Sequence, residues 1–166
     1  IGRVSHLPVL RLAPVKENRN NCPFLTENHC AIHEAEPLVC ALYPLAQEIS
    51  RAGEVHYFLQ PTSCGGQVIE ARVQDYLARY DVPAREAIDV RWAQTCMALE
   101  DTVEQLETVL SPVLVRRMQA KLWQALYFGY DYAQDYLPQL EANLQTLDTE
   151  LRKLTEYQKK RNDSSK

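Results

Sequence analysis

The distribution of prolines and apolar residues divides the chain near residue 66 into two stretches that cannot fold in the same way. Residues 1–66 hold short apolar runs separated by prolines and polar turns. Pro37 and Pro44 lie on either side of Cys40 and disfavour a long helix or strand there. Residues 67–166 instead repeat apolar residues at spacings of three and four, which predicts amphipathic helices.

The first stretch predicts one clear strand, and the second predicts four helices. The strand is the segment from Glu54 to Leu59, which is rich in β-branched and aromatic residues. Proline fits the first turn of a helix, because the N–H that it lacks would have no helical partner there. The helices are expected from about Gln67 to Tyr80, from Pro83 to Leu110, from Ser111-Pro112 to about Gly129, and from between Asp135 and Pro138 to the polar tail at Asn162.

The last predicted helix carries a leucine seam at alternating spacings of three and four, about two and a half heptads long: Leu137, Leu140, Leu144, Leu147, Leu151 and Leu154. A seam of this kind needs a partner, because leucines left exposed on one stripe promote association. We expect the preceding helix to cover the first half. The part from Leu151 to Arg161 is expected to extend beyond that helix and to mediate self-association or to bind a protein partner.

Together these patterns predict a mainly helical α+β fold. A small cysteine-bearing loop and strand module, residues 1–66, is expected to pack on a C-terminal helical bundle, residues 67–166, as one compact domain. With 166 residues, the chain can bury a hydrophobic core without disulfides. A net charge of −4 without a basic stripe argues against a nucleic-acid partner. No apolar stretch approaches the roughly 18 to 20 residues of a membrane span.

Four cysteines in the first stretch form the pattern C-x7-C-x9-C-x23-C: Cys22, Cys30, Cys40 and Cys64. Pro23, Pro37 and Gly65 accompany them, and such breakers let irregular loops converge and release backbone N–H groups that can donate to sulfur. Four thiolates can hold a tetrahedral zinc ion or an iron–sulfur cluster. The pattern lacks the paired CxxC knuckles of zinc fingers. The alternative is that these cysteines are small buried apolar residues.

The remaining candidates have simpler interpretations. The total of five cysteines is odd, which argues against a disulfide framework and favours a reducing cytoplasm or organelle interior. Cys96 lies one turn after Trp92 on an apolar stripe and is expected to be a core thiol. His29 and His33 flank Cys30 and are expected to be solvated turn histidines, with a role as metal ligands in place of a thiolate as the alternative. An acidic, solvated face is expected at Glu34, Glu36 and Glu48.

The residues around the cysteines resemble the YkgJ-type cysteine-cluster family, a zinc- or iron-chelating domain whose relatives include flagellin lysine methylase. The resemblance spans about residues 7–66 and is carried by Cys22 to Leu25, Cys30 to Glu34, Glu36 to Pro44, and Cys64 to Gly66. It implies an iron–sulfur or zinc centre held by Cys22, Cys30, Cys40 and Cys64. The chain departs from the family in having no cysteine before Cys22, and in Glu36-Pro37 and Cys40-Ala41 where Arg-Pro and Cys-Arg are usual.

The sequence therefore predicts a metal-binding protein of the cysteine-cluster type, with an iron–sulfur cluster favoured over zinc. Its role would be electron transfer, metal handling or assistance in assembling another complex. One alternative is a protein-modifying enzyme of the methylase type, which would need a cosubstrate pocket. The other is a structural interaction protein that keeps only a vestigial metal site and acts through its leucine seam. The sequence assigns no catalytic residue.

Overall fold

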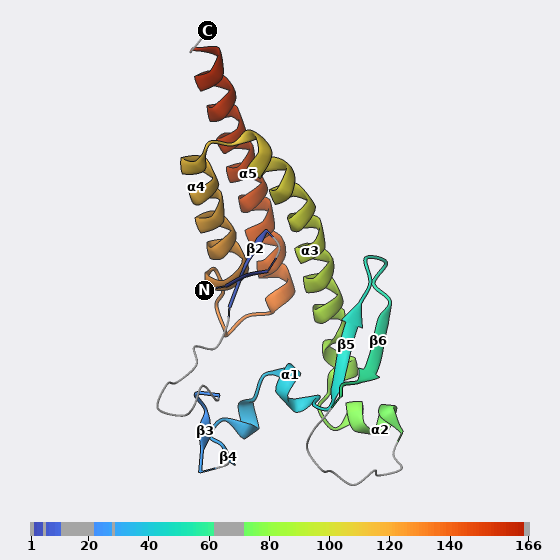
Figure 1. Cartoon of the computed structure of the whole chain (residues 1–166). Coiled ribbons are helices and arrows are strands. Elements are labelled where there is room, and N and C mark those ends of the chain that lie inside the picture. Colours follow the sequence, from blue (N-terminus) through green and yellow to red (C-terminus); the bar gives the residue numbers. More distant parts are fainter. Residues whose placement is uncertain (1, 5, 11–21, 28, 62–71, 165–166) are drawn as a thin grey trace. The chain divides into compact units, whose positions relative to one another are not determined.

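The structure is a computed structural model that describes residues 2–4, 6–10, 22–27, 29–61 and 72–164. Within these residues the chain is a mainly helical α+β protein with three separate two-stranded antiparallel sheets, which confirms the predicted fold class (Figure 1). It forms two compact units. We call residues 12–95 the cysteine unit, and residues 1–11 together with 96–166 the helical unit.

These units differ from the predicted division at residue 66, a position outside the described residues. Helix α2 (Val73–Ala78) and the start of α3 (Val82–Val109) belong to the cysteine unit, although their periodicity had grouped them with the helical stretch. The reason is packing, because Leu77 of α2 and Val82 of α3 are buried in the same cluster as Leu42 and Leu45. Periodicity identifies an apolar helix face but does not identify its partner.

The cysteine unit consists of short elements around that small core. They are β3 (Leu25–Thr26), β4 (His29–Cys30), the 3₁₀ turn η2 (His33–Ala35), α1 (Leu38–Ala41), β5 (Leu45–Ile49), β6 (Val55–Leu59), α2 and the first part of α3. β6 confirms the predicted strand, and it pairs antiparallel with β5 so that Gln47 lies opposite Tyr57. The turn between them contains Gly53 at φ +85°, a conformation that favours glycine.

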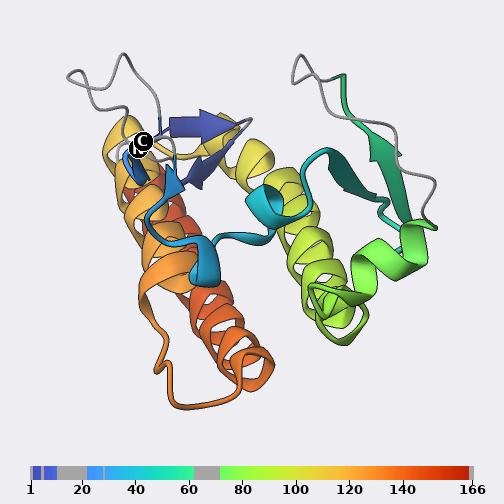
Figure 2. The same cartoon turned by 90° about the horizontal axis from the view of Figure 1, so that it is seen from below.

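The helical unit contains the rest of α3 together with α4 (Pro112–Trp123), the π-helical turn η3 (Gln124–Phe128), α5 (Tyr136–Asp163), and the strands β1 (Gly2–Val4) and β2 (Leu7–Val9). The long helices α4 and α5 lie side by side (Figures 1 and 2). Together with α3 they contribute fully buried side chains to the core: Val103, Met118, Leu122 and Leu140. Helix α4 begins at the predicted Ser111-Pro112 pair. None of the helices among the described residues has the length and apolar character needed to cross a bilayer.

The leucine seam of α5 is covered within its own unit over more of its length than predicted. Leu147 and Leu151 are buried, and Leu144 and Leu154 pack against the same core. The backbone N–H of Ser111, in the α3–α4 connection, donates to Gln158 Oε1 at 3.0 Å. The helix therefore overruns its partner later than the predicted Leu151, because that leucine is only 6% exposed and Gln158 still contacts the α3–α4 connection. The end of α5 does extend beyond that connection (Figure 1). Self-association or a protein partner on this helix stays a prediction.

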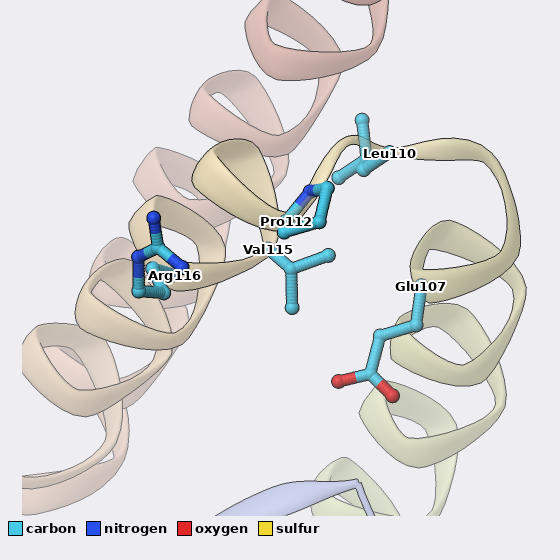
Figure 3. A pocket seen from close by; sticks show the side chains of 5 residues that line it. All are labelled: Glu107, Leu110, Pro112, Val115 and Arg116. Carbon is cyan, nitrogen blue, oxygen red and sulfur yellow. The ribbon is translucent and has the colours of Figure 1, made fainter.

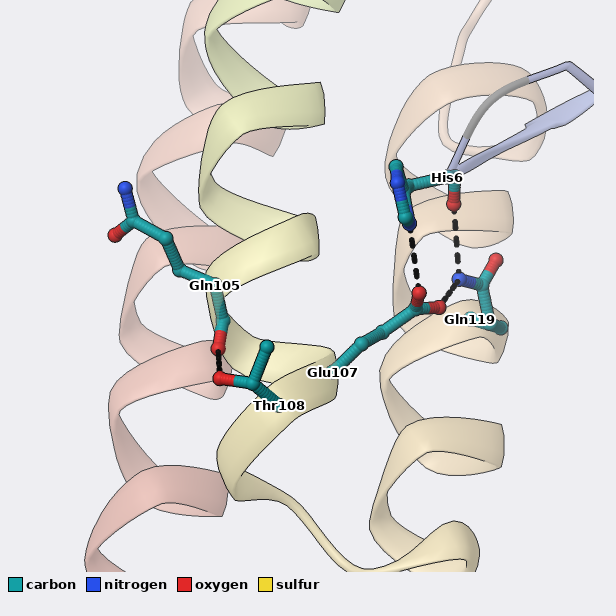
Figure 4. Close-up of polar contacts among 5 residues, drawn as sticks. All are labelled: His6, Gln105, Glu107, Thr108 and Gln119. Atoms are coloured by element: carbon teal, nitrogen blue, oxygen red, sulfur yellow. Dashed lines mark hydrogen bonds and ion pairs between the residues drawn. The ribbon is translucent and has the colours of Figure 1, made fainter.

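The β1–β2 hairpin is attached to the helices of its unit by specific polar contacts (Figure 4). His6 Nδ1 lies 2.7 Å from Glu107 Oε2 on α3. Gln119 of α4 donates to the His6 carbonyl at 3.0 Å and to Glu107 Oε1 at 3.3 Å. The Tyr127 hydroxyl donates to the Pro8 carbonyl at 3.1 Å. The hairpin is thus fixed to α3, α4 and η3.

Candidate cysteine metal centre

A small hairpin positions Cys22 and Cys30. Cys30 ends β4 and pairs with Leu25 of β3. Immediately before β3, the Leu25 N–H donates to the Cys22 carbonyl at 3.1 Å, which folds the Cys22–Leu25 segment into a tight turn. The Ala31 N–H extends the pairing to the Phe24 carbonyl at 2.8 Å. Because Cys22 precedes the first strand and Cys30 ends the second, both cysteines lie at the open end of one hairpin.

Cys40 lies in α1, a helix of only four residues, as expected from the prolines on either side. Its N–H donates to the Pro37 carbonyl at 2.8 Å, and its carbonyl accepts from the Tyr43 N–H at 3.2 Å. The Tyr76 hydroxyl of α2 lies within hydrogen-bond distance of two carbonyls in this turn. It can donate to the Tyr43 carbonyl at 2.9 Å and to the Ala41 carbonyl at 3.2 Å. Tyr76 therefore braces the turn that follows Cys40.

The charges of Cys22 and Cys30 act on the Cys40 thiol. Partial desolvation, the Glu36 carboxylate and the nearby Cys22 and Cys30 raise the pKa of the Cys40 thiol above its ordinary value. Cys22 and Cys40 are exposed and Cys30 is half-buried, and all three are thiols rather than disulfides. Among the described residues, however, no three His, Cys, Asp or Glu side chains are arranged to hold a metal ion. Cys64 lies outside those residues, so a centre of four cysteines stays a prediction.

The environment of Glu36, near this site, differs from the one predicted from the sequence. It was expected on a solvated acidic face, but its side chain is 15% exposed and its charge acts on Cys40. It also pairs with His33, whose Nδ1 lies 3.4 Å from Glu36 Oε1. The only sequence signal was its position directly before Pro37.

His29 and His33, the two histidines near Cys30, each already have one ring nitrogen in a polar contact. His29 Nδ1 lies 2.9 Å from the Glu27 carbonyl, which requires a hydrogen on Nδ1 and leaves the Nε2 lone pair available to a metal. His33 Nδ1 is engaged by Glu36. Both residues are exposed to solvent.

Cys96 is separate from this group, as predicted. It is half-buried and packs against the core of the helical unit. Burial, followed by the negative charge of Glu100, raises the pKa of its thiol from 9.0 to about 11. A thiol in such surroundings is a poor metal ligand and a poor nucleophile, because both roles need the thiolate.

This difference predicts selective alkylation. At pH 8, Cys96 should carry about 100-fold less thiolate than an ordinary cysteine, since its pKa is about two units higher. Iodoacetamide should therefore modify Cys22, Cys30 and Cys40 in the metal-free protein well before Cys96, as followed by peptide mass spectrometry. Raising the pH toward 11 should accelerate Cys96 most. Unfolded protein is the control, and equal rates for Cys96 and Cys22 in the folded protein would contradict this prediction.

The helical unit contains an open pocket of about 430 Å³ between the end of α3 and the start of α4. Glu107 and Arg116 lie on opposite sides of it, with Leu110, Pro112 and Val115 between them (Figure 3). The Glu107 carboxylate is already engaged by His6 and Gln119. The lining of this pocket therefore does not suggest a binding or catalytic site.

Comparisons of the chain with family models, with curated proteins and with solved structures found no match. What the cysteines do has to be inferred from their own geometry and chemistry.

Proposed function

We propose that this chain is a metal-binding protein of the YkgJ-type cysteine-cluster family, in which Cys22, Cys30, Cys40 and Cys64 hold an iron–sulfur cluster or zinc. The observation that supports it most is the electrostatic influence of both Cys22 and Cys30 on the Cys40 thiol. These cysteines come from separate elements, and their proximity is what a shared ligand requires.

The donor set suits a soft metal. Thiolates are the preferred ligands of zinc and of iron–sulfur clusters, and Cys22 and Cys30 add negative charge near Cys40 once they ionise. That repulsion, together with Glu36, is part of the reason why the pKa of Cys40 is raised. A bound cation would reverse this effect by stabilising the thiolate form. When present, an iron–sulfur cluster would supply a redox centre, and zinc would supply a structural cross-link.

The exposure of the site suggests what it is used for. Cys22 and Cys40 are exposed, so the centre would lie at the protein surface. Val39 and Tyr43, which flank Cys40, are 72% and 46% exposed and would add an apolar rim for a protein partner. We therefore favour transfer of electrons or of metal to another protein, or assistance in assembling that protein, in the reducing cytoplasm or an organelle interior.

Anaerobic purification followed by metal analysis and visible spectroscopy tests this proposal. A broad absorbance near about 400 nm with iron and sulfide would identify an iron–sulfur cluster, and a colourless protein with stoichiometric zinc would identify zinc. The matched control is the chain with serine at positions 22, 30, 40 and 64. Protein that binds neither metal, before or after reconstitution, would overturn the proposal and favour the methylase-type enzyme or the structural interaction protein.

A further inference from the structure

A second site of defined chemistry lies in the helical unit, where the connection between η3 and α5 encloses a pocket of about 310 Å³. Its lining includes four tyrosines, Tyr127, Tyr130, Tyr132 and Tyr136, together with Asp131 and Gln139. None of the eight described residues that line it is basic. It begins directly after a π-helical turn, a local irregularity that is frequent at functional sites.

The connection is held in one conformation by side chains of α5. Gln139 Nε2 donates to the carbonyls of Asp131 and Asp135, both at 3.0 Å, while its Oε1 accepts from the Asp131 N–H at 2.7 Å. Asn143 Nδ2 donates to the Gly129 carbonyl at 2.9 Å. A Cβ atom at position 129 would meet that same nitrogen at 2.9 Å, so any larger residue would force the Asn143 side chain to move. The pocket is therefore preorganised.

The aromatic rings are also ordered. The rings of Tyr130 and Tyr136 stack at 5.1 Å between centroids with 23° between their planes. Tyr132 is 98% exposed, so its ring is held out in solvent beside the pocket instead of being packed into the core. An aromatic ring in that position is available to close over a ligand, and its burial would be favourable.

The hydrogen-bond donors of the lining point away from a ligand. The Tyr127 hydroxyl donates to the Pro8 carbonyl and the Tyr130 hydroxyl to the Ala125 carbonyl at 2.9 Å. The Tyr136 hydroxyl in turn hydrogen-bonds to Tyr130. The hydrogens of these three hydroxyls are therefore already used within the protein and are not available to a ligand.

Asp131 adds a full negative charge. The Ala133 N–H and the Gln134 side chain donate to its carboxylate at 3.0 and 2.8 Å, and they lower the pKa of Asp131 below its ordinary value. The start of α5 has the opposite polarity and on its own would attract an anion, but Asp131 and Asp135 lie at that end of the helix. The Asp131 carboxylate, in an aromatic lining whose described residues include no basic side chain, favours a positively charged ligand.

We propose that this tyrosine pocket binds an organic cation through an alkylammonium group. Ammonium groups interact favourably with aromatic faces within about 6 Å, and a nearby carboxylate adds Coulomb attraction. The same group is carried by free amines and by the lysine side chain of a protein partner. This proposal concerns the helical unit and is independent of the metal centre.

Titrations followed by NMR of ¹³C-labelled tyrosine rings test it, at constant ionic strength. Choline represents a free quaternary amine, n-butylammonium represents the end of a lysine side chain, and 3,3-dimethylbutanol is the uncharged analogue of choline. We expect saturable shifts at the pocket tyrosines with a Kd on the order of millimolar for at least one cation, and none for the alcohol. The tighter cation shows whether the pocket prefers a quaternary or a primary ammonium group. Absence of saturation with both cations, or equal binding of the alcohol, would overturn the proposal.

Variants locate the site. Tyr132→Ala should weaken binding roughly 2- to 5-fold, the usual strength of one exposed cation–π contact, and Tyr132→Phe should restore it. Because Tyr132 is almost fully exposed, its removal should leave the fold intact, which circular dichroism checks. Tyr157, exposed elsewhere on α5, is the matched control, and Tyr157→Ala should bind normally. Equal effects of Tyr132→Ala and Tyr157→Ala would show that the cation does not bind in this pocket.

Discussion

Replacing Cys40 with serine is expected to lower metal affinity at least about 100-fold, so that the purified protein retains little metal. Cys40 is the thiol on which both Cys22 and Cys30 act, and a serine hydroxyl is not a soft ligand. The measurement is metal per chain after anaerobic purification, with free-metal titration of the reconstituted protein. Binding to the native chain should also weaken as the pH falls, because protons compete with the metal for the thiolates.

Cys96→Ala is the matched control for this experiment. Cys96 packs against the core of the helical unit, so its replacement should leave metal content unchanged and reduce the free energy of unfolding by about 1 kcal/mol. The proposed ligand set would be contradicted if Cys40→Ser kept its metal, or if Cys96→Ala lost it. A Cys40→Ser protein that unfolds is distinguished by its far-ultraviolet circular dichroism.

Truncation after Asp148 is expected to destabilise the chain by at least about 3–5 kcal/mol, a large part of the total stability of most domains. The deletion removes Leu151, which is buried, and Leu154, which packs against the same core. It also removes Gln158, the hydrogen-bond partner of the Ser111 N–H. Thermal unfolding should show a Tm lower by roughly 10 °C. The sequence had suggested the opposite, because the seam was expected to overrun its partner from Leu151.

Truncation after Lys159 provides the comparison. This shorter deletion keeps Gln158 and every leucine of the seam, and it removes a helix end whose described side chains are exposed. Its effect on stability should be within about 0.5 kcal/mol. If both truncations were equally harmless, the last turns of α5 would contribute nothing to the core, contrary to their burial.

The features predicted correctly from the sequence are those set by neighbours along the chain. The strand from Val55 to Leu59, the start of α4 at Pro112 and the short α1 between two prolines follow from local composition. The β1–β2 hairpin was not predicted, because its partners Glu107 and Gln119 lie more than a hundred residues away in the sequence. The assignment of α2 to the cysteine unit was missed for the same reason.

The candidate sites show the same limit. The cysteines were identified because their residue type and local context are distinctive, but the contributions of Glu36 and Tyr76 depend on contacts that no spacing indicates. The tyrosine pocket had a sequence signal in the concentration of tyrosines on both sides of Asp131. The structure is needed to show that these tyrosines and Asp131 line one pocket whose described residues include no basic side chain.

The attachment of the first hairpin to α3 also imposes an order on biosynthesis. His6 and Glu107 are separated by 101 residues, so a ribosome that adds roughly 5–20 residues per second needs about 5–20 s between them. Throughout that interval the hairpin lacks its partners, while residues 12–95 are completed. The cysteine unit can therefore fold on the nascent chain before the helices that hold the hairpin have been synthesised. The hairpin, although synthesised before that unit, reaches its final contacts after it.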